Sequence, residues 1–505
     1  MFDKFVEGIN NELNVSVTEN GALGYKTTGK DLLDFNFKVA SYRTKSDEDI
    51  IVDFKKAWYE NKELALKFLF YARDIREGLG ERRLFRVCIK DLVKEIDNRV
   101  FDWIAEYGRY DDLFVFFNTE KQNDMMEYVR IQLMKDMENC IANKNVSLLA
   151  KWMPSVKTSS KESMAMARKF IKYFNSNNEE EKITQKTYRK TLSRLRAYID
   201  VIEKKQCANK WDEINYETVP SMANLKYKDA FLKHDTERRK QYLASLEKGE
   251  SKINASVTYP HNIVNKYLKQ DGWYNYSLNK YDQALESMWK SLPDYVKGNA
   301  NTLVVRDGSG SMLSEFNGVK PLDISTALAI YFSEKCEGVF KDKFITFSAQ
   351  PKFISLENYS TLRDKLQRCY KEDDCSNTNI EATFDLVLKT AVKNNLKQEE
   401  IPNLLIISDM EFDAAHNYIQ RNDKKLFEVI AKKYAAHGYT LPKLIFWNVS
   451  SRTATIPVKQ NENGVILVSG YSASICKMVL QEETDPYKAL LSVLNSERYK
   501  QITVK

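Results

Sequence analysis

Cysteine, proline and glycine are all scarce in this chain of 505 residues. The seven Cys residues are scattered and form no Cys-x-x-Cys pair, and the four His residues form no zinc-binding pattern. This usage excludes a disulfide framework and predicts a reduced, intracellular compartment. Ten Pro and seventeen Gly residues offer few interruptions to regular structure, which favours helix.

Long apolar segments are missing as well. No run approaches the roughly 20 apolar residues that cross a bilayer. The first eight residues carry acids where a secretory signal would be basic and then apolar. We therefore expect a cytoplasmic protein without a membrane partner, and the length predicts two domains.

The most specific pattern in the chain is Asp307-x-Ser309-x-Ser311, which directly follows the apolar and β-branched residues 302–305. One carboxylate and two hydroxyls at alternate positions of a turn can converge on one hard cation. Mg²⁺ would keep open positions there for water or for an oxygen from a partner. Asp, Ser and Gly also form ordinary turns, so the pattern alone leaves that alternative open.

A second apolar run, residues 403–407, also leads to an acid, Asp409. Further apolar runs at 343–347, 444–449 and 465–468 alternate with helical stretches such as 325–336 and 426–436. This alternation predicts a doubly wound parallel sheet. Ligands in such sheets bind at the carboxyl ends of strands, near the topological switch point, and both acids lie at strand ends.

Residues 299–505 resemble a von Willebrand factor A domain. The resemblance implies a metal-ion-dependent adhesion site for Mg²⁺ or another divalent cation, formed by Asp307, Ser309, Ser311, Thr378 and Asp409. Ser376-Asn377 stands where that family has Gly-Gly. Two alternatives stay open: a degenerate domain without metal, and a hydrolytic site that also uses Glu411 and Asp413. Two acids after a strand end more often belong to a solvated loop.

Residues 1–298 are predicted to form helix after helix, for example at 63–76, 82–96, 125–137 and 225–246. Connections between the expected helices are short and polar. Stacked hairpins of the HEAT type, curved into an arc or ring, are the arrangement we expect. The predicted fold is therefore an α-helical domain (1–298) followed by an α/β domain (299–505).

Positive charge collects in the middle of the chain, since residues 151–300 carry the whole excess behind the net charge of +7. Clustered cations, hydroxyls and a helix start can bind phosphates, and interleaved Tyr side chains can stack on unpaired bases. The alternatives are a solvated helix face and a Ser159-x-x-Glu162 capping box that only starts a helix. The candidate RNA-binding residues are Lys157, Lys161, Arg168, Lys169, Lys172, Lys186, Arg189, Lys190, Arg194, Arg196 and His261.

The order of the two parts resembles that of Ro-type ribonucleoproteins, the TROVE-domain family. Segments 71–85, 106–113, 149–154 and 188–196 are similar to uncharacterised Ro-like proteins. The resemblance implies an RNA-binding protein that is not an enzyme. In Ro, single-stranded RNA ends enter a helical ring and small structured RNAs bind its basic outer face. A protein partner would supply an acid to the metal. The alternative is a metal-dependent assembly module, such as a virion or scaffold component, that binds no RNA.

Overall fold

The computed structural model describes residues 14–176, 182–270, 276–299, 301–315, 319–347, 350–372, 379–413, 426–457, 464–480 and 485–504. Among them, no helix combines the length and the apolar character that a membrane span requires. The chain is rich in helix around one mixed sheet, which confirms the predicted order of an α part followed by an α/β part at this coarse level.

The first part consists of helices joined by short connections, as the scarcity of Pro and Gly predicts. Its short strands form two small hairpins, β1 (Ser16–Val17) with β2 (Leu23–Gly24) and β3 (Leu268–Gln270) with β4 (Tyr276–Leu278). The expected helix 225–246 is two helices instead, because the chain leaves helical geometry at Asp235, whose carboxylate accepts a hydrogen bond from Tyr216. The helices are α2 (Asp31–Phe37), α3 (Asp47–Glu60), α4 (Lys62–Arg73), α5 (Arg82–Asp91), α6 (Val100–Tyr107), α7 (Gln122–Ile141), α8 (Leu149–Trp152), α9 (Lys161–Ser176), α10 (Gln185–Tyr198), α11 (Ile202–Cys207), α12 (Ser221–His234), α13 (Thr236–Glu247), α14 (Pro260–Tyr267) and α15 (Gln283–Lys290).

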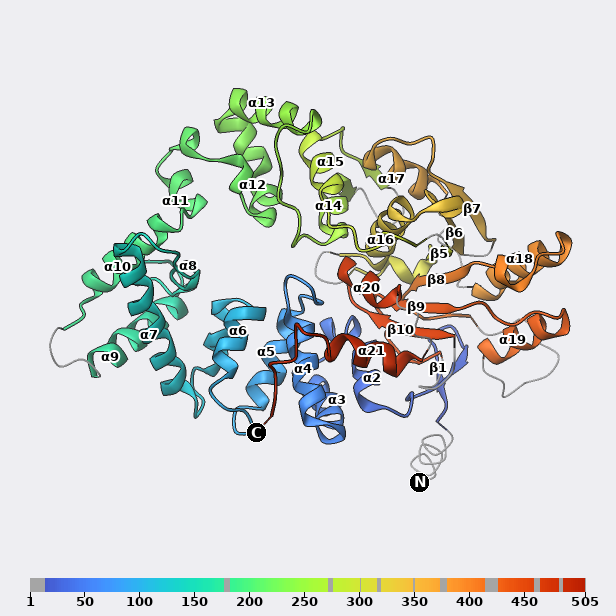
Figure 1. Ribbon diagram of the computed structural model, residues 1–505, viewed down its shortest axis with the longest axis horizontal. Coiled ribbons are helices and arrows are strands. Elements are labelled where there is room, and N and C mark those ends of the chain that lie inside the picture. The colour runs from blue at the N-terminus through green and yellow to red at the C-terminus, as the bar shows by residue number, and fades with distance from the viewer. Residues whose placement is uncertain are drawn as a thin grey trace.

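These helices follow one another around an arc that begins and ends at the sheet (Figure 1). The arc closes on itself, since the hydroxyl of Tyr259 donates to the carbonyl of Leu79 at 2.7 Å. Gly80 permits this approach: its φ is +73°, and a Cβ there would lie 2.3 Å from the Tyr259 hydroxyl. The two ends of the helical part therefore touch each other as well as the sheet.

The sheet has six strands in the order β10-β9-β8-β5-β6-β7. All neighbours are parallel except β7, which runs antiparallel to β6 at one edge. The five strands predicted from the sequence are the parallel ones. The edge strand β7 was not predicted, because it is only partly buried and so lacks a continuous apolar run. The strands are β5 (Thr302–Asp307), β6 (Lys343–Phe347), β7 (Lys352–Ser355), β8 (Asn403–Ser408), β9 (Leu444–Asn448) and β10 (Val465–Ser469).

Helices cover the sheet, and one of them comes from the first part of the chain. Helix α2 packs on β10, where Asn36 Nδ2 donates to the carbonyl of Leu467 at 3.3 Å. One continuous apolar core consequently joins the first helices to the sheet. The helices of the second part are α16 (Pro321–Lys335), α17 (Leu362–Lys371), α18 (Ile380–Lys393), α19 (Leu426–Ala436), α20 (Cys476–Val479) and α21 (Pro486–Leu494).

Candidate functional site

The strand order reverses between β5 and β8, and two acids lie at the carboxyl ends of these two strands. Asp307 is the last residue of β5, and Asp409 directly follows β8. Both side chains are fully buried. The structure thus brings the two predicted acids together at the place where doubly wound sheets bind ligands.

Asp307 is held by its own loop and by the neighbouring strand. Its Oδ1 accepts from the backbone N–H of Ser309 at 2.9 Å, and its Oδ2 accepts from the hydroxyl of Ser408 at 2.6 Å. The hydroxyls of Ser309 and Ser311 lie 3.0 Å apart. The loop therefore gathers one carboxylate and two hydroxyls, as the alternating pattern predicts.

Burial raises the pKa of both acids. For Asp409, the neighbouring charge of Asp307 raises the pKa further, while the guanidinium of Arg452 opposes the shift. Nη2 of Arg452 lies 3.4 Å from Asp409 Oδ2, and it also contacts Glu19 Oε2 at 2.5 Å. Two buried carboxylates that repel each other, and that Arg306 and Arg452 neutralise only in part, form a site that favours a cation.

The chemistry of the donors fits a hard divalent cation. Carboxylate and hydroxyl oxygens are ligands that Mg²⁺ accepts, and two neutral hydroxyls leave positive charge available for a further anionic ligand. In the described ranges, no three His, Cys, Asp or Glu side chains cluster as metal ligands, so the hydroxyls have to complete the set. Thr378, the remaining predicted ligand, lies outside the described residues.

Glu411, two residues after Asp409, does not belong to a solvated loop as expected, because it is fully buried. Its Oε1 accepts from the backbone N–H of Arg452 at 2.7 Å and of Thr453 at 2.9 Å, and its Oε2 accepts from the N–H of Glu19 at 2.8 Å. Glu411 therefore ties the loop after β8 to the loop after β9 and to the N-terminal segment. The backbone of Asp413 pairs with that of Gly21, in the same N-terminal segment, as an isolated antiparallel β-bridge.

Arg452 is the residue of this site that sequence reasoning missed. A signal was available, because Arg452 follows β9, whose carboxyl end lies at the same edge of the sheet as those of β5 and β8. The contribution of Glu19 had no local signal, because this residue reaches the site from the far end of the chain.

The basic candidates form two exposed stripes. On α9 they recur at helical spacing, as do those on α10, and Lys157 lies in the loop before α9. Within the described ranges, no acid lies within 4.0 Å of any of them. The predicted cap at Ser159 lies one residue later, because the hydroxyl of Ser160 accepts from the N–H of Ser163 at 3.2 Å where α9 begins. The exposed candidates are Lys157, Lys161, Arg168, Lys169, Lys172, Lys186, Arg189, Lys190 and Arg194.

The other two candidates have contacts within the fold. Arg196 donates to the carbonyls of Ala150 at 2.8 Å and Met153 at 2.7 Å, and so fastens α10 to the end of α8. His261 is buried and stacks on Tyr259. Burial, with the charge of Arg43, lowers the pKa of His261 to about 3. A neutral packing role fits this residue better than a contact with phosphate.

Comparisons with known proteins identify relatives without a known function. Residues 18–95 and 124–301 match the model of the family described as Domain of unknown function (DUF2828), and residues 301–501 match Domain of unknown function (DUF7788). "Uncharacterized protein L728" of Acanthamoeba polyphaga mimivirus is 31% identical over 527 residues, which cover 95% of this chain and 87% of that protein.

Among solved structures, proximal thread matrix protein 1 from the mussel byssus aligns at 15% identity with a TM-score of 0.24. The match covers 37% of this chain and about half, 47%, of that chain.

Proposed function

The chain belongs to the DUF2828 family, and from the features of its own surface we propose that it is an RNA-binding protein of the Ro type. The observation that carries the proposal is the pair of basic stripes on α9 and α10. Their eight cations, and Lys157 in the loop before α9, have no acidic partner among the described residues. Clustered, unneutralised Lys and Arg side chains are the electrostatic footprint of a phosphate-binding surface.

Two finer structural proposals go with this function. We propose that residues 299–505 form a von Willebrand factor A domain, supported by the strand order and by the acids at its point of reversal. We also propose that the helical arc is of the HEAT-like, TROVE type, supported by its closure between Leu79 and Tyr259. The proposed location is the cytoplasm, and catalysis forms no part of the proposal, because both oxygens of Glu411 already accept hydrogen bonds.

Binding of a fluorescent single-stranded RNA and a hairpin RNA, followed by anisotropy, tests the proposal. The test variant reverses two exposed charges on α9, Arg168→Glu and Lys172→Glu. The control reverses Lys389 and Lys393, which are exposed and have the same spacing on α18. The α9 variant should bind at least about tenfold more weakly, with a salt slope smaller by roughly 1.4, since each single-strand phosphate neutralised contributes about 0.7. Equal losses in the two variants would contradict the proposal.

A second candidate function is metal-dependent docking of a protein partner without RNA. The buried pair Asp307 and Asp409 favours it, because a cation there would keep a position for a partner's carboxylate. Asp307→Ala should then abolish Mg²⁺-dependent capture of an acidic partner and leave any RNA affinity unchanged. Capture by the wild-type chain should survive treatment with nuclease. Capture that persists in the Asp307→Ala variant would exclude this function.

A further inference from the structure

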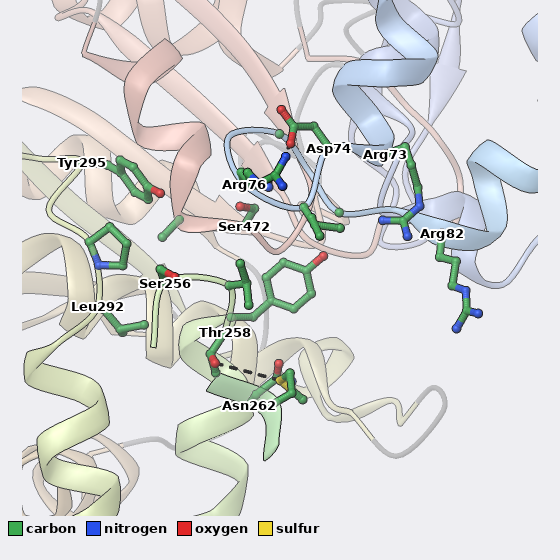
Figure 2. A pocket seen from close by; sticks show the side chains of 18 of the residues that line it. Arg73, Asp74, Arg76, Arg82, Ser256, Thr258, Asn262, Leu292, Tyr295 and Ser472 are labelled. Atoms are coloured by element: carbon green, nitrogen blue, oxygen red, sulfur yellow. Dashed lines mark hydrogen bonds between the residues drawn. The ribbon is translucent and has the colours of Figure 1, made fainter. Parts of the chain in front are cut away.

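A cavity of about 210 Å³ lies where the two ends of the helical arc meet the second part of the chain. Its walls come from the loop between α4 and α5, from the segment before α14, and from residues 472–473 (Figure 2). Four guanidinium groups line it, those of Arg73, Arg76, Arg82 and Arg109. Neutral polar side chains line it as well, including Ser256, Thr258 and Asn262.

Three of the four arginines have acidic partners. Arg73 Nε donates to Asp112 Oδ2 at 2.8 Å, Arg82 pairs with Asp111, and Arg76 Nη1 lies 3.5 Å from Glu106 Oε1. The fourth, Arg109, differs. Within the described ranges its guanidinium has neither a hydrogen bond nor an ion pair, and it lies over the ring of Trp152, 5.2 Å from the centroid.

The cavity therefore carries more positive than negative charge. Asp74, the acid on its wall, is already paired with Arg498, whose Nη2 donates to Asp74 Oδ1 at 2.9 Å. Together, the charged lining groups, their direct partners and Arg86, which shares Asp111 and Asp112 with them, include six guanidinium groups against four carboxylates, an excess of two positive charges. These groups are Arg73, Arg76, Arg82, Arg86, Arg109 and Arg498, with Asp74, Glu106, Asp111 and Asp112.

Arg109 experiences this excess directly. Burial lowers the pKa of Arg109 and the charge of Arg73 lowers it further, while the charge of Asp111 opposes the shift. A partly buried cation without an acid in direct contact reduces stability, and an anion in the cavity would offset that cost. Arginine suits such a ligand because its planar group donates two parallel hydrogen bonds to phosphate.

We propose that this cavity binds a small molecule through a phosphoryl group carried as a dianion, with Arg109 as its principal contact. The excess of two positive charges matches the charge of a phosphomonoester. The volume lies below the roughly 300–1,000 Å³ of pockets that enclose drug-sized ligands, so the carrier of the phosphoryl group is small. The site goes beyond the proposed RNA binding, because it shares no residue with the stripes on α9 and α10.

Calorimetric titration of the full chain with inorganic phosphate, at fixed ionic strength set by chloride, tests the proposal. Phosphate should bind with saturation, and Arg109→Gln should lower its affinity by at least about tenfold. The matched control Arg189→Gln, on α10, should leave it unchanged. Because the Arg109 guanidinium has no ion pair or hydrogen bond to lose among the described residues, only its contact with the Trp152 ring, its variant should unfold close to the wild-type temperature. No saturable phosphate binding by the wild-type chain would overturn the proposal.

RNA affinity, measured on the same proteins, separates this site from the proposed function. Arg109→Gln should bind RNA as the wild type does, whereas the α9 double variant should bind phosphate normally and RNA weakly. If Arg109→Gln lost RNA and phosphate affinity together, the cavity would be part of the RNA site, and the small-molecule proposal would fail. If the α9 variant kept full RNA affinity while Arg109→Gln lost phosphate, the RNA proposal would fail and the cavity proposal would stand.

Discussion

The buried carboxylate of Glu411 should be the strongest single link between the N-terminal segment and the candidate metal site. Its Oε1 accepts from the backbone N–H groups of Arg452 and Thr453, and its Oε2 from that of Glu19. In Glu411→Gln, the amide NH₂ must replace one of these oxygens. Either orientation sets a donor against at least one backbone donor, and both remove the negative charge.

The expected cost of Glu411→Gln follows from these contacts. A hydrogen bond to a charged group contributes about 1.5–3 kcal/mol, and a buried donor left unsatisfied costs about 1–3 kcal/mol. We therefore expect Glu411→Gln to lower the free energy of unfolding by roughly 3–5 kcal/mol, a large share of the about 5–15 kcal/mol typical of a native protein.

Urea denaturation measures the loss of stability, and hydrogen exchange locates it at the amides of Glu19, Arg452 and Thr453. The control is Glu428→Gln, which removes a carboxylate whose described partner is the Tyr25 hydroxyl at 3.2 Å, a bond that an amide oxygen can still accept. Its cost should stay below about 1 kcal/mol. Unchanged exchange at the three amides in Glu411→Gln would refute the reasoning.

Three further predictions concern charge and closure. Burial raises the pKa of Asp323 from 3.8 to about 6, so the folded state loses stability as pH rises between these values. Asp323→Asn should be more stable by up to roughly 3 kcal/mol above about pH 7 and equal near pH 3, and a pH-independent difference would contradict this. Arg452→Gln removes a cation that lies 3.4 Å from Asp409 and would repel a metal ion. The variant should therefore bind Mg²⁺ about tenfold more tightly in calorimetry, and weaker binding would count against the cation site. Gly80→Ala should lower the stability measured by thermal unfolding by about 2 kcal/mol more than Gly249→Ala does. Both glycines have a φ of +73°, but a Cβ would meet a neighbour, Tyr259, only at position 80. Equal losses would argue against closure of the arc at this position.

The acids of the candidate site could be predicted because their signal is local. Asp307 and Asp409 each follow an apolar run, and the carboxyl ends of neighbouring parallel strands meet at one edge. The burial and the contacts of Glu411 were harder to predict, because its partner Glu19 is 392 residues away. A surface acid and a buried acid also look alike in the sequence. The same reason hid the cavity: Arg109 and its neighbours come together only when the arc closes.

The helical part also has features that a local pattern predicts and features that depend on distant contacts. Periodicity predicted its helices, since apolar spacing reflects the buried face of each helix. It could not show that Arg196 turns inward to the carbonyls after α8, or that Tyr259 and His261 pack where the arc closes. A cation at helical spacing looks the same whether it faces solvent or a carbonyl.

The most direct test of RNA binding is to purify the protein, at moderate salt, from the cells that make it. The ultraviolet absorbance of the sample is then measured at the maxima of nucleic acid and of protein, and the ratio of the two is taken. Any nucleic acid released is then sequenced. We predict a ratio raised by bound nucleic acid and a few enriched small RNAs. A ratio typical of protein alone, together with no binding to added single-stranded RNA, would contradict the proposed function.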